Sequence, residues 1–298
     1  MVAIIENAST DNISTRVPAF IAEQAKRLKA VGISSASAEV EWILCHVLEV
    51  SRLDLYLHGA KLLNPERRQQ IEAIIRRRLT REPLQFILGE AFFYGRRFIV
   101  TPAVMAPTPE TEGLVERALG FVRTAGIPSP AILDVGVGSG VIALTMACEL
   151  PSARVVAVDI SPAALEVAQQ NAALLSVNER VDLRVSDFFS AVCEDEQFDL
   201  ILSNPPYIAE PDYDSLDPEI HADPKIALTA GKDGLDCIKV IVREAPRFLR
   251  AGGRIMFEIG YGQADKVAAL VEADKRYVSL DIIKDLNDID RIVILGCG

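Results

Sequence analysis

Cysteine is scarce in this chain, and what there is lies scattered. The 298 residues hold five cysteines, an odd number, and no two of them form a CxxC pair: Cys45, Cys148, Cys193, Cys237 and Cys297. Disulfide frameworks and zinc sites need paired or closely spaced cysteines, so we expect neither, and we expect no metal. The pattern favours a reducing compartment, the cytoplasm.

Long apolar runs are missing as well. A membrane-spanning helix needs about 18 to 20 consecutive apolar residues, and no window approaches this although half of the residues are hydrophobic. The first residues, MVAIIENASTDN, lack the basic stretch followed by an apolar stretch of a secretory leader. We therefore expect a soluble, untargeted, cytoplasmic protein with no membrane partner.

Positive charge is scarce after residue 100. Residues 1–100 hold 14 Lys and Arg against 11 Asp and Glu, a net charge of +3, whereas the remainder holds 17 against 31, a net charge of −14. An acidic body repels a phosphate backbone unless a local basic patch attracts it. One candidate patch exists, and a solvated helix face is its simpler interpretation: Arg76, Arg77, Arg78 and Arg81. We expect no direct nucleic-acid partner.

The first third of the chain has a helical pattern. Two segments carry apolar residues at helical spacing: Phe20, Ile21, Ala25 and Leu28, then Trp42, Ile43, Val47 and Leu48. A third helix is predicted to begin after an Asn64 cap, with Pro65 in its first turn. We predict a helical domain over residues 1–85. Residues 86–105, with aromatic and β-branched residues broken by Gly89 and Gly95, predict a β-hairpin linker.

From residue 131 onward, strand-like runs alternate with helical stretches. The runs are AILDV, RVVAVD, VDLRVSD, FDLILSN, GRIMFEIG and RIVILG. This alternation predicts an α/β domain with a parallel sheet covered by helices, over residues 106–298. Ligands of such sheets bind at the carboxyl ends of the strands, near the point where the strand order reverses. The residues that follow the strands are therefore the site candidates.

A glycine loop follows the first of these strands. The sequence ILDVGVGSGVIAL places it before a helix, so that its backbone can approach a ligand; it consists of Gly136, Val137, Gly138, Ser139 and Gly140. The spacing GxGxG differs from the GxGxxG of dinucleotide sites and suits a ligand without phosphate. Asp159, which ends the next strand, can accept both hydroxyls of a ribose. For the loop alone, a tight strand-to-helix turn is the structural alternative.

The third strand ends in Ser186, Asp187 and Phe188. These residues can bracket a purine, with Asp187 accepting from the exocyclic amine and Phe188 packing on its face. A capped helix start is the structural alternative for this stretch.

The fourth strand ends in a rigid corner, residues 204–207 with the sequence NPPY. Its two prolines fix their own backbone angles and extend the residue before each. The side-chain carbonyl of Asn204 and the main-chain carbonyl of Pro205 then converge on a point about 3 Å from each, where an NH₂ group can donate two hydrogen bonds. Tyr207, after Pro206, can cover the flat face of that group. A structural turn is the alternative.

With DVGVGSG, VAVD, SDFF and NPPY in order, the second half resembles the class I S-adenosylmethionine-dependent methyltransferases, in the branch acting on planar nitrogens. EPLQFILGEAFFYG, PTPETE, DPKIALTAGKDGL and GGRIMFEIGYGQ further resemble the peptide chain release factor glutamine methyltransferases. The resemblance implies a Rossmann-like domain with a mostly parallel, seven-stranded sheet, preceded by a helical substrate-recognition domain. It also implies S-adenosyl-L-methionine as cofactor, S-adenosyl-L-homocysteine as product, and the Gly-Gly-Gln loop of class 1 release factors as substrate.

By position, the resemblance implies that residues 136–140 wrap the cofactor, that Asp159 holds its ribose, and that Asp187 and Phe188 flank its adenine. Asn204, beside the cofactor, would grip the substrate glutamine together with Pro205, Pro206 and Tyr207. Asn204, Pro205 and Tyr207 are the predicted catalytic residues. Because an amide nitrogen is a poor nucleophile, catalysis is expected to come mainly from positioning. No general base is evident from the sequence. Glu110 and Glu112 are predicted at the pocket rim, and His221 is considered for a lid or catalytic role.

Two positions depart from the family pattern. Thr108 stands where arginine is usual, and Asn287 or Asp288 stands where a glycine is usual. A related methyltransferase with another protein acceptor is therefore an alternative, as is an amino-methyltransferase acting on a base in DNA or ribosomal RNA. A non-catalytic scaffold that binds the cofactor is a third alternative.

Overall fold

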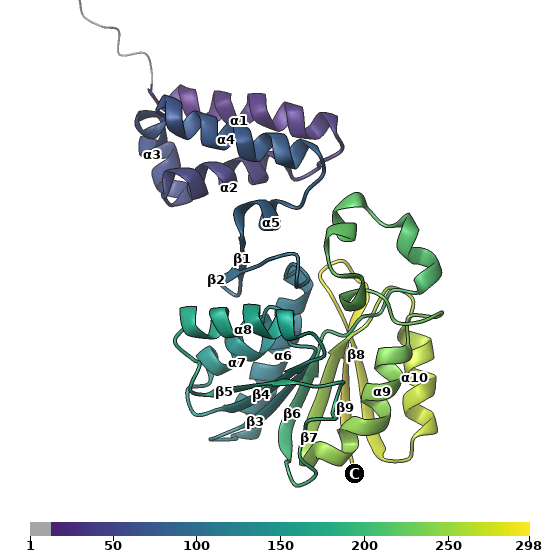
Figure 1. Ribbon diagram of the computed structural model, residues 1–298. Helices are drawn as coiled ribbons and strands as arrows, with labels where there is room; N and C mark the ends of the chain where they lie inside the picture. Colours follow the sequence, from purple (N-terminus) through teal and green to yellow (C-terminus); the bar gives the residue numbers. More distant parts are fainter. Residues whose placement is uncertain (1–12) are drawn as a thin grey trace, which may run out of the picture. The chain divides into compact units, whose positions relative to one another are not determined.

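The computed structural model describes residues 13–298 (Figure 1). The chain divides between Leu88 and Gly89 into a helical unit and a larger α/β unit. Each unit has its own hydrophobic core.

The helical unit is a small bundle. Its helices are α1 (Ile13–Ala30), α2 (Ala36–Leu48), α3 (Arg52–Leu62), α4 (Pro65–Leu79) and the short α5 (Leu84–Leu88). The predicted start of α4 is confirmed, because the Asn64 side chain accepts the N–H of Arg67 at 2.8 Å and Pro65 is the first helical residue. The core of the bundle includes Leu28, Ile43, Leu44, Ile71 and Ile75. The helices α3 and α5 were not predicted.

The arginines of α4 differ in their environment. Arg76 is exposed and pairs with Glu72 at 3.2 Å, as expected for a solvated face. Arg78 contradicts that interpretation, because it is buried and its Nε donates to the Glu39 carboxylate at 2.6 Å. The charge of Arg78 is thus matched inside the bundle.

The α/β unit begins with a hairpin of β1 (Glu90–Phe93) and β2 (Arg96–Ile99). The side chain of Asn171 ties this hairpin to the glycine loop. Its Oδ1 accepts the N–H of Ile99 at 2.6 Å, and its Nδ2 donates to the carbonyls of Ile99 and Ser139, both at 2.9 Å. The hairpin therefore packs as part of this unit.

The main sheet has seven strands: β3 (Ala131–Val135), β4 (Arg154–Asp159), β5 (Val181–Val185), β6 (Phe198–Ser203), β7 (Leu249–Glu258), β8 (Tyr277–Lys284) and β9 (Asp290–Cys297). Their order is β5-β4-β3-β6-β7-β9-β8. The pairs from β5 to β7 are parallel, and β9 runs antiparallel to both of its neighbours. The predicted mostly parallel, seven-stranded α/β fold is confirmed, and β8 is the one strand that was not predicted.

Helices cover both faces of the sheet (Figure 1). One face packs against α6 (Pro109–Ala125), α7 (Val141–Glu149) and α8 (Pro162–Leu174), and the other packs against α9 (Asp236–Glu244) and α10 (Ala264–Ala273). Successive strand residues alternate between the two cores, as Ile132 and Leu133 do. Among residues 13–298, no helix is both long and apolar enough to span a membrane.

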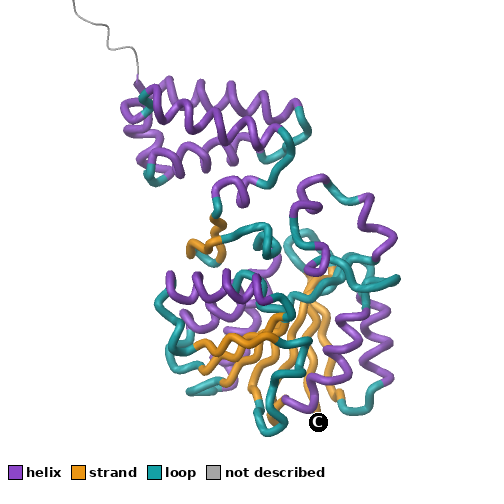
Figure 2. The backbone as a smooth tube through the Cα atoms, viewed as in Figure 1, coloured by secondary structure: helices purple, strands orange, loops and turns teal. Residues whose placement is uncertain are grey.

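The strand order reverses between β3 and β6, which are neighbours in the sheet although β4 and β5 lie between them in sequence. The glycine loop after β3 and the NPPY corner after β6 therefore meet at one edge. The long connection from β6 to α9 carries three short 3-10 helices: Glu210–Ser215, Pro218–Ala222 and Lys225–Ala227 (Figure 2). Its two ends are joined, because the N–H of Ile208 donates to Leu228 and that of Ala230 donates to Ile208, both at 2.9 Å.

Candidate active site

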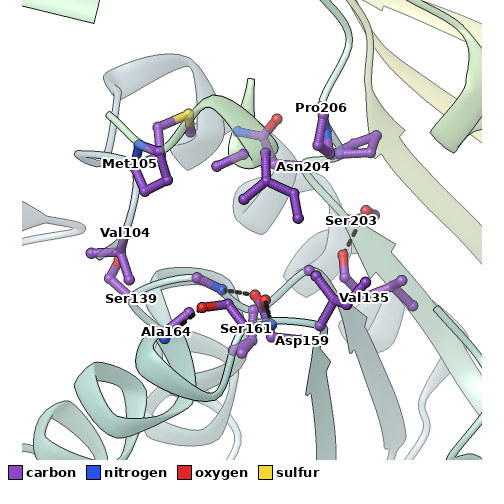
Figure 3. Close-up of a pocket in the computed structure, with 18 of the residues that line it drawn as sticks. Val104, Met105, Val135, Ser139, Asp159, Ser161, Ala164, Ser203, Asn204 and Pro206 are labelled. Atoms are coloured by element: carbon purple, nitrogen blue, oxygen red, sulfur yellow. Dashed lines mark hydrogen bonds between the residues drawn. The ribbon is translucent and has the colours of Figure 1, made fainter. Parts of the chain in front are cut away.

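A cavity of about 240 Å³ opens at the carboxyl edge of the sheet (Figure 3). It brings together ten of the twelve residues predicted for the site: Gly136, Val137, Gly138, Ser139, Asp159, Asp187, Phe188, Asn204, Pro205 and Pro206. Gly140 and Tyr207 are not among its lining residues. The arrangement follows from the fold, since the ends of β3, β4, β5 and β6 lie side by side.

The glycines of the loop after β3 have two roles: two of them leave the backbone open to a ligand, and the third allows close packing against a helix. Gly136 and Gly138 have φ of +83° and +53°, and a Cβ on either would meet no heavy atom within 4 Å. Their backbone thus borders open space, as close approach by a ligand requires. Gly140 has φ of +89°, and a Cβ there would lie 2.7 Å from Cδ1 of Leu144. Gly140 is needed for packing against α7.

Asp159 is held by main-chain donors. Its Oδ2 accepts the N–H of Gly138 and its Oδ1 accepts the N–H of Ser161, both at 2.9 Å. Ser161 caps α8, because its hydroxyl accepts the N–H of Ala164 at 3.2 Å. A carboxylate offers about four acceptor positions, so Asp159 retains capacity for two further donors, such as the hydroxyls of a ribose.

The loop that carries Asp187 and Phe188 is shaped by Ser186. The Ser186 hydroxyl donates to the carbonyl of Phe188 at 2.8 Å and accepts the N–H of Ala191 at 2.9 Å. Phe188 adopts a φ of +46°, which is uncommon for a residue with a side chain. These bonds turn Phe188 so that it lines the cavity.

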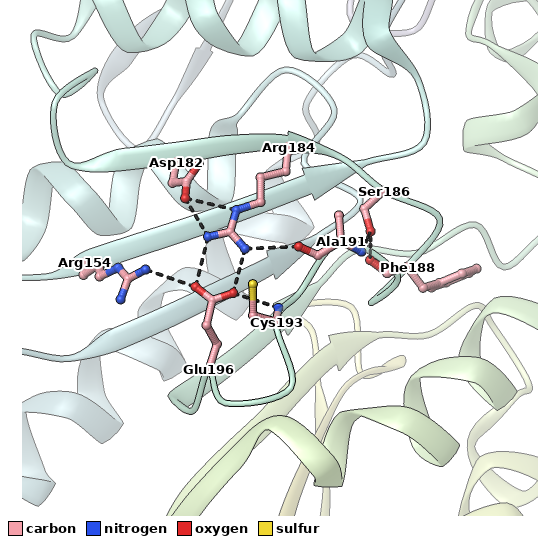
Figure 4. Close-up of polar contacts among 8 residues, drawn as sticks. All are labelled: Arg154, Asp182, Arg184, Ser186, Phe188, Ala191, Cys193 and Glu196. Atoms are coloured by element: carbon pink, nitrogen blue, oxygen red, sulfur yellow. Dashed lines mark hydrogen bonds and ion pairs between the residues drawn. The ribbon is translucent and has the colours of Figure 1, made fainter.

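An ion-pair network braces this loop from the sheet (Figure 4). Arg184 of β5 donates to both carboxylate oxygens of Glu196, at 2.6 and 2.9 Å, and to the carbonyl of Ala191 at 3.1 Å. It also pairs with Asp182 at 2.6 Å. The hydrogen bond from Arg184 lowers the pKa of Glu196 to about 2. The loop is therefore fixed to a largely buried ion pair.

The NPPY corner is anchored on three sides. The Ser203 hydroxyl donates to the carbonyl of Val135 at 2.7 Å, which joins β6 to β3. The Asn204 amide nitrogen donates to the hydroxyl of Thr111 at 3.0 Å. The carbonyl of Tyr207 accepts from Nε2 of Gln263 at 2.9 Å. Because Nδ2 of Asn204 is turned to Thr111, its Oδ1 remains available as an acceptor at the cavity.

Tyr207 is partly buried and packs against the core that lies under α9 and α10. Burial raises the pKa of its hydroxyl, which keeps the side chain neutral. A Cβ on Gly260 would lie 3.0 Å from its ring, so the glycine makes room for it.

Part of the lining was not predicted from the sequence. It comes from the segment before α6, from the first turn of α6 and from the loop after NPPY: Ala103, Val104, Met105, Pro107, Thr111, Pro224, Ile226, Ala227 and Thr229. Within PTPETE the lining residues are Pro107 and Thr111, and neither Glu110 nor Glu112 is among them. Glu112 instead accepts the N–H of Tyr94 at 2.6 Å. His221 is exposed and makes an edge contact with the ring of Tyr213.

Two buried carboxyls next to the site were also missed. Asp134 in β3 accepts the N–H of Ala143 at 3.0 Å, and burial raises its pKa to about 7. Glu258 at the end of β7 is 1% exposed, and burial raises its pKa to about 7 as well. One oxygen of each, Oδ1 and Oε1, has no hydrogen-bond partner among residues 13–298. A charged residue inside an apolar strand was the available signal for both.

Family models match both units. A model of the PrmC N-terminal domain matches residues 20–89, and a model of the methyltransferase small domain matches residues 122–264. A release factor glutamine methyltransferase of Cereibacter sphaeroides is 45% identical over 268 residues, covering 90% of this chain and 93% of that protein. One of Geobacter sulfurreducens is 42% identical, covering 88% and 90%.

The chain belongs to the release factor glutamine methyltransferase family. The family resemblance found in the sequence is thereby confirmed. This family member also shares its fold with the 16S rRNA N2 G1207 methyltransferase RsmC of T. thermophilus, solved with AdoMet and guanosine. The TM-score is 0.54 at 20% identity, over 70% of this chain and 50% of that chain. The human Mettl16 catalytic domain gives a TM-score of 0.55 at 13% identity, over 67% and 74%.

Proposed function

We propose that this protein transfers a methyl group from S-adenosyl-L-methionine to the side-chain amide nitrogen of the glutamine in the Gly-Gly-Gln loop of class 1 peptide chain release factors. The observation that carries the proposal is the amide orientation of Asn204, whose Nδ2 donates to Thr111. Oδ1 of Asn204 and the carbonyl of Pro205 are then two acceptors beside one cavity, which matches the two hydrogens of a primary amide. Membership of the family supports this acceptor.

The residues that line the cavity fit an S-adenosylmethionine-type cofactor. The bare backbone at Gly136 and Gly138 leaves space for a ligand, and Asp159 has acceptor capacity left for a ribose. Asp187 and Phe188 would flank the adenine. Bound there, S-adenosylmethionine would supply an electrophilic methyl group and would leave as S-adenosylhomocysteine.

The corner residues would act by positioning. An amide nitrogen is a poor nucleophile because its lone pair is delocalised into the carbonyl. Oδ1 of Asn204 and the Pro205 carbonyl would hold both N–H groups, which orients the nitrogen for in-line attack. The same acceptors stabilise positive charge that develops on the nitrogen, more strongly in a water-excluded cavity than in solution. In the net reaction the nitrogen would give up one proton, which would pass to solvent water.

The helical unit would recognise the acceptor protein, with residues 1–85 as its domain, 86–105 as linker and 106–298 as the methyltransferase domain. A nucleic-acid substrate is the weaker alternative. The candidate basic patch at the end of α4 is smaller than the sequence suggested, because Arg78 is buried and paired with Glu39. Residues 101–298 carry a net charge of −14, which repels a phosphate backbone.

The test is methyl transfer from labelled S-adenosylmethionine to a purified release factor by the wild type and by Asn204→Ala. We expect turnover to fall by about two orders of magnitude or more, because both positioning and charge stabilisation are lost. Affinity for S-adenosylhomocysteine, measured by calorimetry, should stay nearly unchanged. Turnover of Asn204→Ala equal to that of the wild type would sink the role of this residue.

A further inference from the structure

Gln263 is a buried amide to which the proposed mechanism gives no role. It is the N-cap residue of α10, at the end of the loop after β7, and it is 7% exposed. A buried amide is unfavourable unless its polar atoms have hydrogen-bond partners. Both the oxygen and the nitrogen of Gln263 are bonded to main-chain groups, and these groups come from three different loops.

The partners of Gln263 fix the orientation of its amide. Oε1 accepts the N–H of Gly260 at 2.8 Å, and Nε2 donates to the carbonyls of Tyr207 at 2.9 Å and Gly234 at 3.2 Å. A reversed amide would place its NH₂ group against an N–H and its oxygen against two carbonyls. Gln263 therefore joins the NPPY corner, the turn before α9 and the loop after β7.

Two glycines make room for this junction. Gly234 has φ of +71°, and a Cβ there would clash with the carbonyl oxygen of Tyr207 and lie 2.8 Å from Nε2 of Gln263. A Cβ on Gly260 would lie 3.0 Å from the Tyr207 ring and 3.1 Å from Oε1 of Gln263. The absence of side chains at these two positions lets Gln263 reach the main chain of Tyr207.

A stiff piece of chain connects Tyr207 to the two acceptors of the corner. Pro206 stands between Pro205 and Tyr207, and prolines restrict both their own backbone and that of the residue before them. At the other end of the corner, Nδ2 of Asn204 donates to Thr111 at 3.0 Å. Oδ1 of Asn204 and the Pro205 carbonyl thus lie between two anchors. A shift of the Tyr207 main chain would therefore move the Pro205 carbonyl.

We propose that Gln263 is a positioning residue, which holds the NPPY corner so that its two acceptors meet the amide of the substrate glutamine. The proposal deepens the proposed function and rests on it for the identity of the acceptor. Gln263 is not among the residues that line the cavity, so it acts through Tyr207. The cavity wall after the corner depends less on it, because the main-chain bonds of Ile208 with Leu228 and Ala230 remain.

Kinetics on a release factor test this role first. Gln263→Leu removes all three hydrogen bonds, and we expect kcat per S-adenosylhomocysteine-binding site, counted by calorimetry, to fall about 10- to 100-fold, the effect of a misplacement of about 1 Å. The KM for S-adenosylmethionine and the Kd for S-adenosylhomocysteine should change little.

Gln197→Leu is the matched control for this substitution. Nε2 of Gln197 also donates to a main-chain carbonyl, that of Arg247 at 2.9 Å, but it does so at the opposite end of β6 from the NPPY corner. The Gln197→Leu variant should keep the kcat of the wild type.

A double-mutant cycle separates positioning from a general effect on the fold. When Asn204→Ala has already removed one acceptor of the corner, we expect Gln263→Leu to lower kcat by less than about threefold, because the two residues act on the same group of the substrate. Single-turnover transfer of labelled methyl groups measures these low rates. A residue that served the fold alone would lower kcat by the same factor in both backgrounds.

A second variant covers the case in which Gln263→Leu does not fold. Gln263→Glu keeps an acceptor for the N–H of Gly260, but at about pH 8 its carboxylate has no hydrogen to donate to Tyr207. We expect the same fall in kcat. A further readout needs no turnover: the side-chain NH₂ signals of Asn204 in ¹⁵N-labelled protein, assigned by their loss in Asn204→Ala, should shift in either Gln263 variant and not in Gln197→Leu.

Wild-type kcat in Gln263→Leu or in Gln263→Glu would overturn the proposal. So would an equal loss in both backgrounds of the cycle, a rise in the Kd for S-adenosylhomocysteine as large as the fall in kcat, or Asn204 signals that do not move. A wild type that methylates no release factor, with Asn204 signals that shift in the Gln263 variants, would leave the hold on the corner intact and defeat the proposed function.

Discussion

Replacing Glu196 by glutamine removes the charge at the centre of the network that braces the Phe188 loop. Glu196 accepts two hydrogen bonds from Arg184 and one from the N–H of Cys193 at 3.0 Å. The side chains of Glu196 and Arg184 are only 13% and 20% exposed. The pair is thus shielded from most of the solvent screening that weakens surface ion pairs.

The expected loss of stability in Glu196→Gln can be worked out from the pKa of Glu196. Pairing with Arg184 lowers the pKa of Glu196 from 4.5 to about 2, and each unit corresponds to about 1.4 kcal/mol, so the upper bound is about 3.4 kcal/mol. Because glutamine keeps some hydrogen bonds, we expect a loss of about 2 to 3 kcal/mol in the free energy of unfolding at pH 7. A carboxyl whose pKa is lower in the folded protein than in the unfolded chain stabilises the folded state at pH values above the unfolded pKa. For Glu196, this stabilisation disappears as the pH falls from about 4.5 towards 2.

The assay is urea unfolding of the wild type and Glu196→Gln at pH 7 and at pH 3. The difference between them should shrink at the lower pH. Glu194→Gln is the control, because Glu194 is 91% exposed and lies 3.6 Å from Arg247, so its loss should cost less than about 0.5 kcal/mol. Equal stability of Glu196→Gln and the wild type at pH 7, or a deficit that persists unchanged at pH 3, would refute the reasoning.

Three further predictions concern the site and its frame. Asp159→Asn places an NH₂ group against a main-chain donor, so the Kd for S-adenosylhomocysteine should rise about tenfold or more by calorimetry; unchanged affinity would contradict the role of Asp159. Gly140→Ala should lower the free energy of unfolding by about 1 to 3 kcal/mol in urea, because its Cβ meets Leu144 at a positive φ, and wild-type stability would refute this. Asp288→Gly should raise stability by about 0.5 kcal/mol, because Asp288 has φ of +61°, whereas a loss would show that the aspartate is preferred there.

Most of the fold could be predicted because its strands are apolar runs with clear ends. The exceptions have physical reasons. β8 lies at the sheet edge and mixes apolar and polar residues, with Val278 exposed, so it lacks the continuous pattern of a central strand. In α3 the leucines 53, 55 and 57 alternate as in a strand, and two of them are exposed.

The site could be predicted where a residue follows a strand, since topology alone brings those ends together. Thr111 could not be found in this way, because it reaches Asn204 from a helix 93 positions earlier. Tyr207 is one of the predicted site residues, yet it packs against the core and is not among the residues that line the cavity. Side-chain direction at a corner depends on packing that local sequence does not specify.

The proposed methyl acceptor is the glutamine in the Gly-Gly-Gln loop of a release factor. The most direct measurement is mass spectrometry of a purified class 1 release factor after incubation with this protein and S-adenosylmethionine, beside a factor whose Gly-Gly-Gln glutamine is changed to alanine. We predict a single added methyl group on the side-chain nitrogen of that glutamine, and none on the alanine factor. An unmodified intact factor, or methylation at another residue of both factors, would contradict the account.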